Sequence, residues 1–240
     1  MDSERDKLKK EGLKKKGAAV FMKIKTKKQI FGSAILVGIL VLLDQFTKYL
    51  AVLFLKEKPS IPIIQGVFEL QYLENTSAAF GMDPISFLHK IFSFDVFIKN
   101  PELFLQVRMG FFIVLTLAMV SVFSLLYLRI PNEKRFIYLD YILIFFTAGA
   151  IGNFIDRVNQ QYVVDFFYFK LINFPIFNVA DIYVTCAAVA MMLLGLFYYK
   201  DEDVDRIFPP KTKQKGDEAF SRLWKNKSAF KTIDYEKRNL

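Results

Sequence analysis

Residues 30–55 read IFGSAILVGILVLLDQFTKYLAVLFL, an apolar run that contains the charged residues Asp44 and Lys48. A helix rises about 1.5 Å per residue and needs about 20 residues to cross the hydrocarbon core of a bilayer. The run is therefore long enough to span a membrane. An ionised side chain inside such a span costs roughly 2.5–3.5 kcal/mol at the helix centre, so each charged residue in it requires an explanation.

Three further apolar runs follow the first one. The sequence is 53% hydrophobic and 24% charged, and the two classes are separated into apolar blocks and charged flanks, as is typical of membrane proteins. We predict an all-α polytopic membrane protein with four transmembrane helices, at residues 30–55, 110–128, 136–155 and 179–199. The predicted organisation is a basic extension (1–29), a four-helix transmembrane domain (30–199) and a basic tail (200–240).

Positive charge predicts the orientation of the chain. Of the 33 lysines and arginines, 25 lie before residue 30, in the connection 129–135, or from Lys200 onward. Because basic residues are enriched in cytoplasmic loops, we expect both termini in the cytoplasm and loops 56–109 and 156–178 outside. The net charge of +9 is assigned to topology, not to nucleic-acid binding, because no aromatic-basic RNA motif accompanies it.

The two outer loops predict a small amount of extramembrane structure. In residues 62–73, PIIQGVFELQYL, apolar and polar residues alternate from Phe68 to Tyr72, which predicts a small extracytoplasmic β-sheet. Residues 82–105 contain a mixed aromatic stretch, and we interpret it as an amphipathic helix on the membrane surface.

Several kinds of catalytic site are excluded by composition. The chain has one cysteine, Cys186, and one histidine, His89. A Cys/His metal site is therefore excluded, and a Ser-His-Asp triad is not supported. We predict no metal and no cofactor.

The polar residues near the predicted membrane surface allow two interpretations each. Asp44 and Lys48 are four residues apart, so they share a helix face; they form either a local ion pair that eases insertion or part of a site. Asn153, Asp156 and Arg157 arrive together at the end of the third span, as a solvated helix end or as a polar cluster. An aspartate there opposes the helix dipole, so Asp156 needs a partner, which Arg157 or Lys48 would supply.

Two more acids lie in the outer connection and at the start of the fourth span. Asp165 stands between two valines and two phenylalanines, and its simpler interpretation is a solvated acid on a surface strand. Asp181 follows Asn178 by three residues, which is typical of a helix cap. The chain topology makes the two acids neighbours, however, and two carboxylates that share a proton can activate a water and protonate a leaving amine.

Five motifs together resemble a known family. They are DQFTK (44–48), NTSAAFG (75–81), GNFIDRV (152–158), VVDF (163–166) and FNVAD (177–181). In this order, across about residues 35–199, they resemble signal peptidase II, the lipoprotein signal peptidase.

The resemblance implies a four-helix membrane aspartyl endopeptidase with an extracytoplasmic β-cradle. Such an enzyme removes the signal peptide from diacylglyceryl-modified bacterial prolipoproteins and cuts before the lipidated cysteine. The family's catalytic aspartates fall on Asp165 and Asp181. Residues that match its supporting and substrate-binding positions are Asp44, Lys48, Asn75, Gly81, Asn153, Asp156, Arg157, Asn178 and Ala180.

The implied location is the bacterial inner membrane, with the active site near the extracytoplasmic face. The implied partners are a lipid-modified prolipoprotein and membrane lipid, with a monomeric enzyme and no nucleic acid. The alternative is a non-enzymatic transporter or scaffold with interfacial acids. A transporter would place acids at several depths, whereas most of them cluster at one level here.

Overall fold

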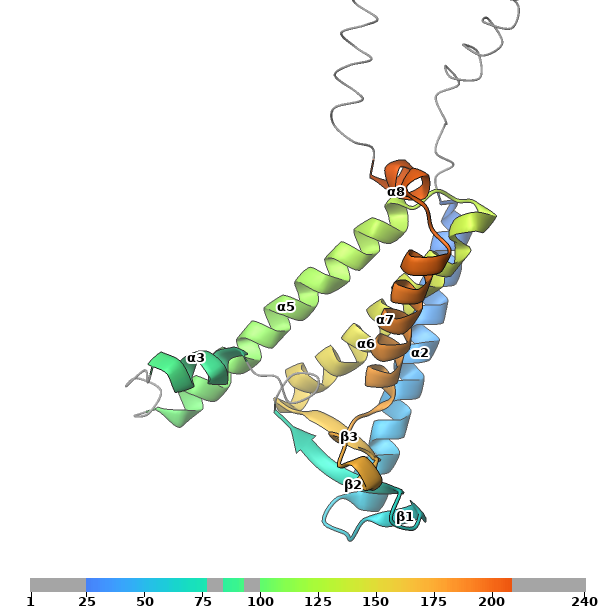
Figure 1. Ribbon diagram of the computed structural model, residues 1–240. Coiled ribbons are helices and arrows are strands. Elements are labelled where there is room, and N and C mark those ends of the chain that lie inside the picture. Colours follow the sequence, from blue (N-terminus) through green and yellow to red (C-terminus); the bar gives the residue numbers. More distant parts are fainter. Residues whose placement is uncertain (1–24, 77–83, 93–99, 209–240) are drawn as a thin grey trace, which may run out of the picture. The chain divides into compact units, whose positions relative to one another are not determined.

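The computed structural model describes residues 25–76, 84–92 and 100–208. Its elements in chain order (Figure 1) are α2 (Lys27–Leu55), β1 (Ile61–Ile64), β2 (Phe68–Asn75), α3 (Pro84–Phe92), α5 (Pro101–Arg129), η2 (Lys134–Phe136), α6 (Ile137–Gln160), β3 (Val163–Tyr168), η3 (Lys170–Ile172), α7 (Val179–Phe197) and α8 (Asp201–Ile207). The chain divides into two units, Met1–Leu193 and Leu194–Leu240. The second unit contains the end of α7 and α8, and the first contains all the other elements.

Four of the helices are long and apolar enough to cross a membrane: α2, α5, α7 and the continuous stretch Lys134–Gln160 that includes α6. Their outward side chains are exposed; Leu42 of α2 is 70% exposed and Leu125 of α5 is 67% exposed. Large apolar side chains exposed along whole helices are expected where lipid, in place of water, surrounds the protein. The predicted fold class, four membrane helices with a small sheet, is confirmed.

The helices are longer than the predicted spans at some ends. α5 begins at Pro101, whereas the predicted span begins at residue 110, and α6 continues to Gln160 beyond the predicted end at residue 155. Apolar composition marks the part of a helix that suits lipid, whereas backbone hydrogen bonding continues into polar residues. At the start of α2, Thr26 forms a capping box with Gln29, which satisfies free N–H groups of the first turn.

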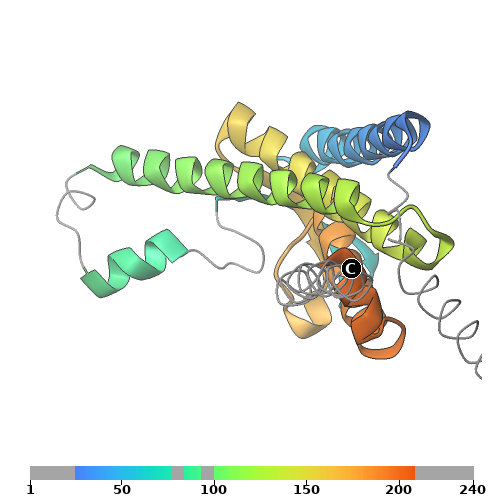
Figure 2. The same cartoon turned by 90° about the horizontal axis from the view of Figure 1, so that it is seen from above.

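Two glycines let α2, α6 and α7 approach closely. A Cβ atom at Gly149 would lie 2.6 Å from the carbonyl oxygen of Ala180, and one at Gly152 would lie 2.5 Å from Asp44 Oδ2. Small residues at helix interfaces in membranes allow such contact. On another side of α6, α5 runs along the same helix (Figure 2).

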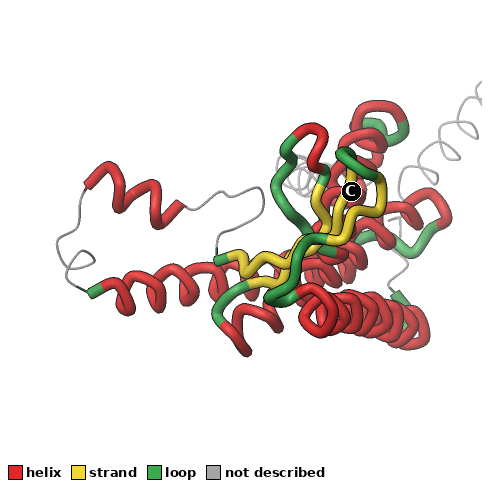
Figure 3. Tube along the Cα trace, turned by 90° about the horizontal axis from the view of Figure 1, so that it is seen from below, coloured by secondary structure: helices red, strands yellow, loops and turns green. Residues whose placement is uncertain are grey.

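The three strands form one antiparallel sheet in the order β1-β2-β3 (Figure 3). The predicted strand region 62–73 is confirmed as sheet, but it is split into β1 and β2 by a turn at Gly66, whose φ of 72° suits glycine. β3 comes from the second outer loop and pairs with β2, so that Leu73 lies opposite Asp165.

The sheet packs against the end of α2. Ala51 and Leu55 of this helix form a buried cluster with Val164 and Phe166 of β3. An isolated bridge between Phe167 and Phe177 then closes the connection from β3 to α7. As a result, α7 begins beside the strand that carries Asp165.

The predicted surface helix within residues 82–105 corresponds in part to α3. Phe87 and Ile91 of this helix are 64% and 55% exposed. Residues 77–83 and 93–99 lie outside the described part of the chain. The location of α3 at the membrane surface stays a prediction.

Candidate active site

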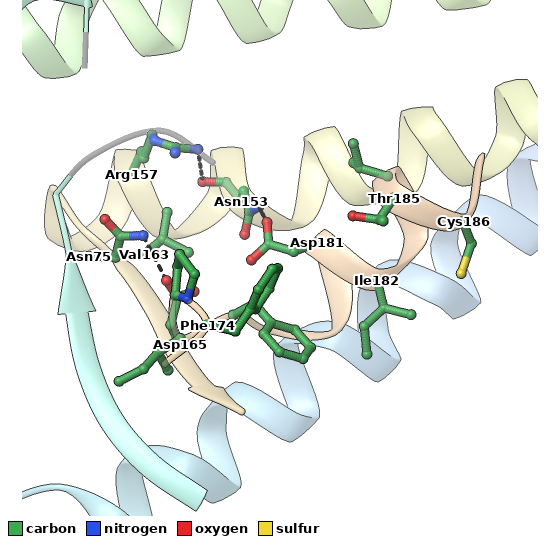
Figure 4. Close-up of a pocket in the computed structure, with 14 residues that line it drawn as sticks. Asn75, Asn153, Arg157, Val163, Asp165, Phe174, Asp181, Ile182, Thr185 and Cys186 are labelled. Carbon is green, nitrogen blue, oxygen red and sulfur yellow. Dashed lines mark hydrogen bonds between the residues drawn. The ribbon is translucent and has the colours of Figure 1, made fainter. Parts of the chain in front are cut away.

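Two aspartates from different elements line one pocket. Asp165 lies in β3 and Asp181 lies in the first turn of α7, and both contribute to a cavity of about 210 Å³. Apolar side chains such as Phe174 and Ile182 belong to the same lining (Figure 4). A mostly apolar cavity with a few convergent polar groups is typical of a substrate site.

Asn178 connects the two aspartates. Its side-chain Nδ2 donates to Asp165 Oδ1 at 2.6 Å, and its backbone N donates to Asp181 Oδ2 at 3.1 Å. The backbone N of Asp181 donates to Asn178 Oδ1 at 3.0 Å in return. This reciprocal pair is the helix cap that the sequence predicts, and the same residue also binds the second acid. The capping role of Asp181 and its place in the pocket are therefore compatible.

Asn153 of α6 occupies the other oxygen of Asp181. Its Nδ2 donates to Asp181 Oδ1 at 2.9 Å (Figure 4). Its Oδ1 accepts from Lys48 Nζ at 2.9 Å and from Asn178 Nδ2 at 3.1 Å. Two donors on the oxygen fix the orientation of the amide, so its nitrogen points at Asp181.

Asp165 is almost completely buried, with 1% of its surface exposed. The interpretation of Asp165 as a solvated acid on a surface strand is therefore wrong, although a strand does carry it. Burial raises the pKa of its carboxyl to about 7, and the nearby charge of Asp181 acts in the same direction. Hydrogen bonds from Asn75 and Asn178 and the charge of Lys48 oppose the rise; the bond from Asn75 Nδ2 to Asp165 Oδ2 is 2.7 Å long.

Lys48 lies behind the pocket in a buried ionic cluster. Its Nζ is 2.9 Å from Asp44 Oδ2 and 2.9 Å from Asp156 Oδ2. The side chains of Lys48, Asp44 and Asp156 are 3%, 0% and 4% exposed. The predicted pair of Asp44 and Lys48 is present, but it is buried and does not reach solvent. Of the two partners expected for Asp156, the structure has Lys48.

Gln45 belongs to this cluster and is absent from the predicted site. Its Nε2 lies 2.9 Å from Asp156 Oδ1, 3.2 Å from Asp44 Oδ2 and 3.1 Å from the carbonyl oxygen of Gly152. Gln45 carries no charge, so the cost of an ionised group inside a span does not single it out. Its position next to Asp44 in an apolar run is the pattern that would have identified it.

Arg157 reaches the pocket from α6. Its Nη1 donates to the carbonyl oxygen of Asn153 at 3.3 Å, and its guanidinium lies 5.2 Å from the ring centroid of Phe112 on α5. The guanidinium therefore places a positive charge on the pocket lining beside the two aspartates.

The structure brings most of the predicted site residues together. The pocket is lined by Asn75, Asn153, Arg157, Asp165 and Asp181. Asp44, Lys48, Asp156, Asn178 and Ala180 lie behind them, joined to them or to one another by hydrogen bonds. Gly81 lies outside the described residues. Within the described ranges, no group of three His, Cys, Asp or Glu side chains is arranged to hold a metal ion.

A protein-family comparison and a search of curated proteins agree with one another. The family model of signal peptidase (SPase) II matches residues 36–197. The lipoprotein signal peptidase of Caldanaerobacter subterraneus is 38% identical over 164 residues, which is 68% of this chain and 94% of that protein. That of Brevibacillus brevis is 38% identical over 165 residues, 68% of this chain and 93% of that protein.

Solved structures support the fold. Two structures of a bacterial membrane enzyme, obtained by the in meso method, match with TM-scores of 0.53 and 0.54 at 22% and 23% sequence identity. Each comparison covers 75% of this chain and 97% or 99% of the other. At this identity the likeness concerns the fold alone.

Proposed function

The chain belongs to the signal peptidase II family, and from this premise we propose that Asp165 and Asp181 are its catalytic pair of aspartates. As a member, it is a bacterial membrane peptidase that removes signal peptides from prolipoproteins. The observation that carries the aspartic mechanism is geometric. The two carboxylates line one pocket and are joined through a single residue, Asn178.

We propose that the two aspartates divide the chemistry between them. The ionised aspartate of the pair takes a proton from the attacking water. Burial raises the pKa of Asp165 to about 7, so the pair keeps one shared proton near neutral pH. The protonated aspartate polarises the scissile carbonyl and then protonates the leaving amine.

We also propose how the substrate lies in the site. The proposed cut lies just before the diacylglyceryl-modified cysteine, with the scissile bond at the two aspartates and the acyl chains in the adjoining bilayer. The excess of positive charge in residues 1–29, 129–135 and 200–240 supports cytoplasmic termini and an active site near the extracytoplasmic face. We propose that the enzyme acts as a monomer and without a cofactor.

The transporter or scaffold alternative is not favoured. The family match covers the membrane helices and both aspartates. An ion path would also require acids at successive depths, whereas Asp44, Asp156, Asp165 and Asp181 are grouped around one pocket.

Cleavage of a lipidated prolipoprotein by purified variants tests the proposal. Asp165→Asn and Asp181→Asn should each lower kcat by roughly 10²–10⁴-fold, the range that positioned acids and bases supply. Glu74→Gln is the matched control: Glu74 forms an exposed ion pair with Lys56 at 2.9 Å and accepts from Tyr72 Oη at 3.1 Å, and its loss should leave the rate unchanged. Circular dichroism in detergent verifies that each variant is folded. A wild-type rate for folded Asp165→Asn would refute the assignment.

A further inference from the structure

Two buried carboxylates outside the pocket each hold the backbone next to a catalytic aspartate. Asp156 Oδ2 accepts from the backbone N of Val164 at 3.2 Å, and Val164 is the residue before Asp165. Asp44 Oδ1 accepts from the backbone N of Ala180 at 2.8 Å, and Ala180 is the residue before Asp181. In both contacts a carboxylate accepts from the backbone N of the residue before a catalytic aspartate. The first joins α6 to β3, and the second joins α2 to α7.

One cation joins the two carboxylates. Lys48 Nζ lies 2.9 Å from Asp44 Oδ2, 2.9 Å from Asp156 Oδ2 and 2.9 Å from Asn153 Oδ1. An ammonium group has three donors, and here each has an acceptor. The cluster is buried, so water does not compete for these bonds and its geometry is well defined.

Two arms therefore run from Lys48 to the catalytic pair. The first passes through Asp156 to Val164 and ends at Asp165, and the second passes through Asp44 to Ala180 and ends at Asp181. Asn153 adds a direct link, since its Nδ2 donates to Asp181 Oδ1 at 2.9 Å. Both catalytic carboxylates are thus connected to the same atom, Lys48 Nζ.

We propose that Lys48 is a positioning residue that sets the separation of Asp165 and Asp181 through these two arms. The inference rests on the proposed function, because it assumes that the two aspartates act together. It explains why Asp44 and Asp156 are ionisable although neither lines the pocket. An ion pair that only eased membrane insertion would need one acid, whereas Lys48 binds two.

Lys48 also acts on the charge of the pair. The charged or titratable groups that affect Asp165 are Asp181 from α7, Lys48 from α2 and Arg157 from α6. The charge of Lys48 lowers the pKa of Asp165. Loss of that charge raises this pKa, so Asp165 keeps its proton to higher pH and the alkaline limb of the activity profile moves upward.

The first test is Lys48→Met, assayed with a lipidated prolipoprotein across the pH range. Displacement of catalytic groups by about 1 Å can cost on the order of 10²-fold, so we expect a kcat loss of that size with KM little changed. The alkaline limb should move to higher pH. Lys56→Met is the matched control, since Lys56 forms an exposed ion pair with Glu74 and contacts neither aspartate. In this variant both kcat and the pH of the alkaline limb should be unchanged.

A second variant keeps the test valid if Lys48→Met does not fold. Asp156→Ala removes one arm and leaves Lys48 paired with Asp44, so no cation is left unpaired. We expect kcat to fall with KM near the wild-type value. In the double variant Lys48→Met/Asp156→Ala, the two losses should not multiply, because both changes break the same arm.

The outcomes separate this inference from the proposed function. Wild-type kcat in folded Lys48→Met or Asp156→Ala, with Asp165→Asn inactive, overturns the positioning role and leaves the catalytic pair intact. A kcat loss without any movement of the alkaline limb in Lys48→Met overturns the electrostatic part. An active Asp165→Asn overturns the catalytic pair itself.

Discussion

Replacing Gly152 by alanine tests the packing beneath the active site. The new Cβ would lie 2.5 Å from Asp44 Oδ2, 3.1 Å from Asp44 Cγ and 3.3 Å from the Cβ of Ala180. Ordinary van der Waals contact begins near 3.5 Å, so the Asp44 carboxylate or α7 must move by about 1 Å. Such a movement breaks bonds of 2.9 Å to Lys48 and 2.8 Å to the backbone N of Ala180.

The expected cost has two parts. Overpacking a well-packed interior costs about 1–3 kcal/mol of stability, and breaking a buried ion pair adds to that cost. The start of α7 carries Asp181, so kcat should also fall, by on the order of 10²-fold for a displacement of this size. The assays are unfolding in detergent followed by circular dichroism, and cleavage of a lipidated prolipoprotein by the folded enzyme.

The same protein contains a matched control. Gly38 lies in α2, and a Cβ there would meet nothing within 4 Å. Gly38→Ala should therefore leave kcat unchanged and should not lower stability, because alanine is at least as favourable as glycine inside a helix. If Gly152→Ala unfolded and cleaved like Gly38→Ala, the close approach of α2, α6 and α7 would not support the site as described.

Three further predictions concern the pocket. Activity should fall as the pH rises through about 7, because burial raises the pKa of Asp165 to that value and the acid must be protonated; a pH profile of kcat that is flat from 6 to 9 would contradict this. Asn75→Ala should move the alkaline limb to higher pH, since the hydrogen bond from Asn75 lowers the pKa of Asp165, and an unmoved limb would show that the bond has no such effect. Asn178→Ala should cost about 0.5–2 kcal/mol in detergent unfolding through loss of the α7 cap and should also lower kcat, whereas loss of stability alone would limit Asn178 to capping.

The membrane helices were predictable because their pattern is local. An apolar run such as 30–55 predicts a membrane helix from its own residues alone. Pro131, with charged residues on both sides, likewise indicates the break between α5 and α6. The helix start at Pro101 was missed, because nothing in hydropathy shows that a helix continues beyond the lipid. The cap formed by Asn178 and Asp181 was predictable because it is also local: the two residues are only three apart in sequence.

Long-range features were harder to predict. Asp165 stands out in the sequence of β3, but the pairing of β3 with β2 joins positions about 90 apart, which a single sequence does not specify. Two partners remained open for Asp156, and only the packing of α2 against α6 selects Lys48. Gln45 was missed because its contacts depend on that packing and its side chain carries no charge to draw attention to it.

The pairing of β2 with β3 has a consequence for how this protein tolerates insertions and deletions. Asp165 lies opposite Leu73, and Asn75 lies opposite Val163, so the ladder determines which way the carboxylate points. Successive side chains of a strand point to opposite faces of the sheet. A slip of β3 by one residue against β2 would therefore turn Asp165 away from the pocket, although the sequence would be unchanged. A one-residue deletion in β2 should turn Asn75 away from Asp165 and lower activity, whereas the same deletion in the 56–60 connection should be tolerated.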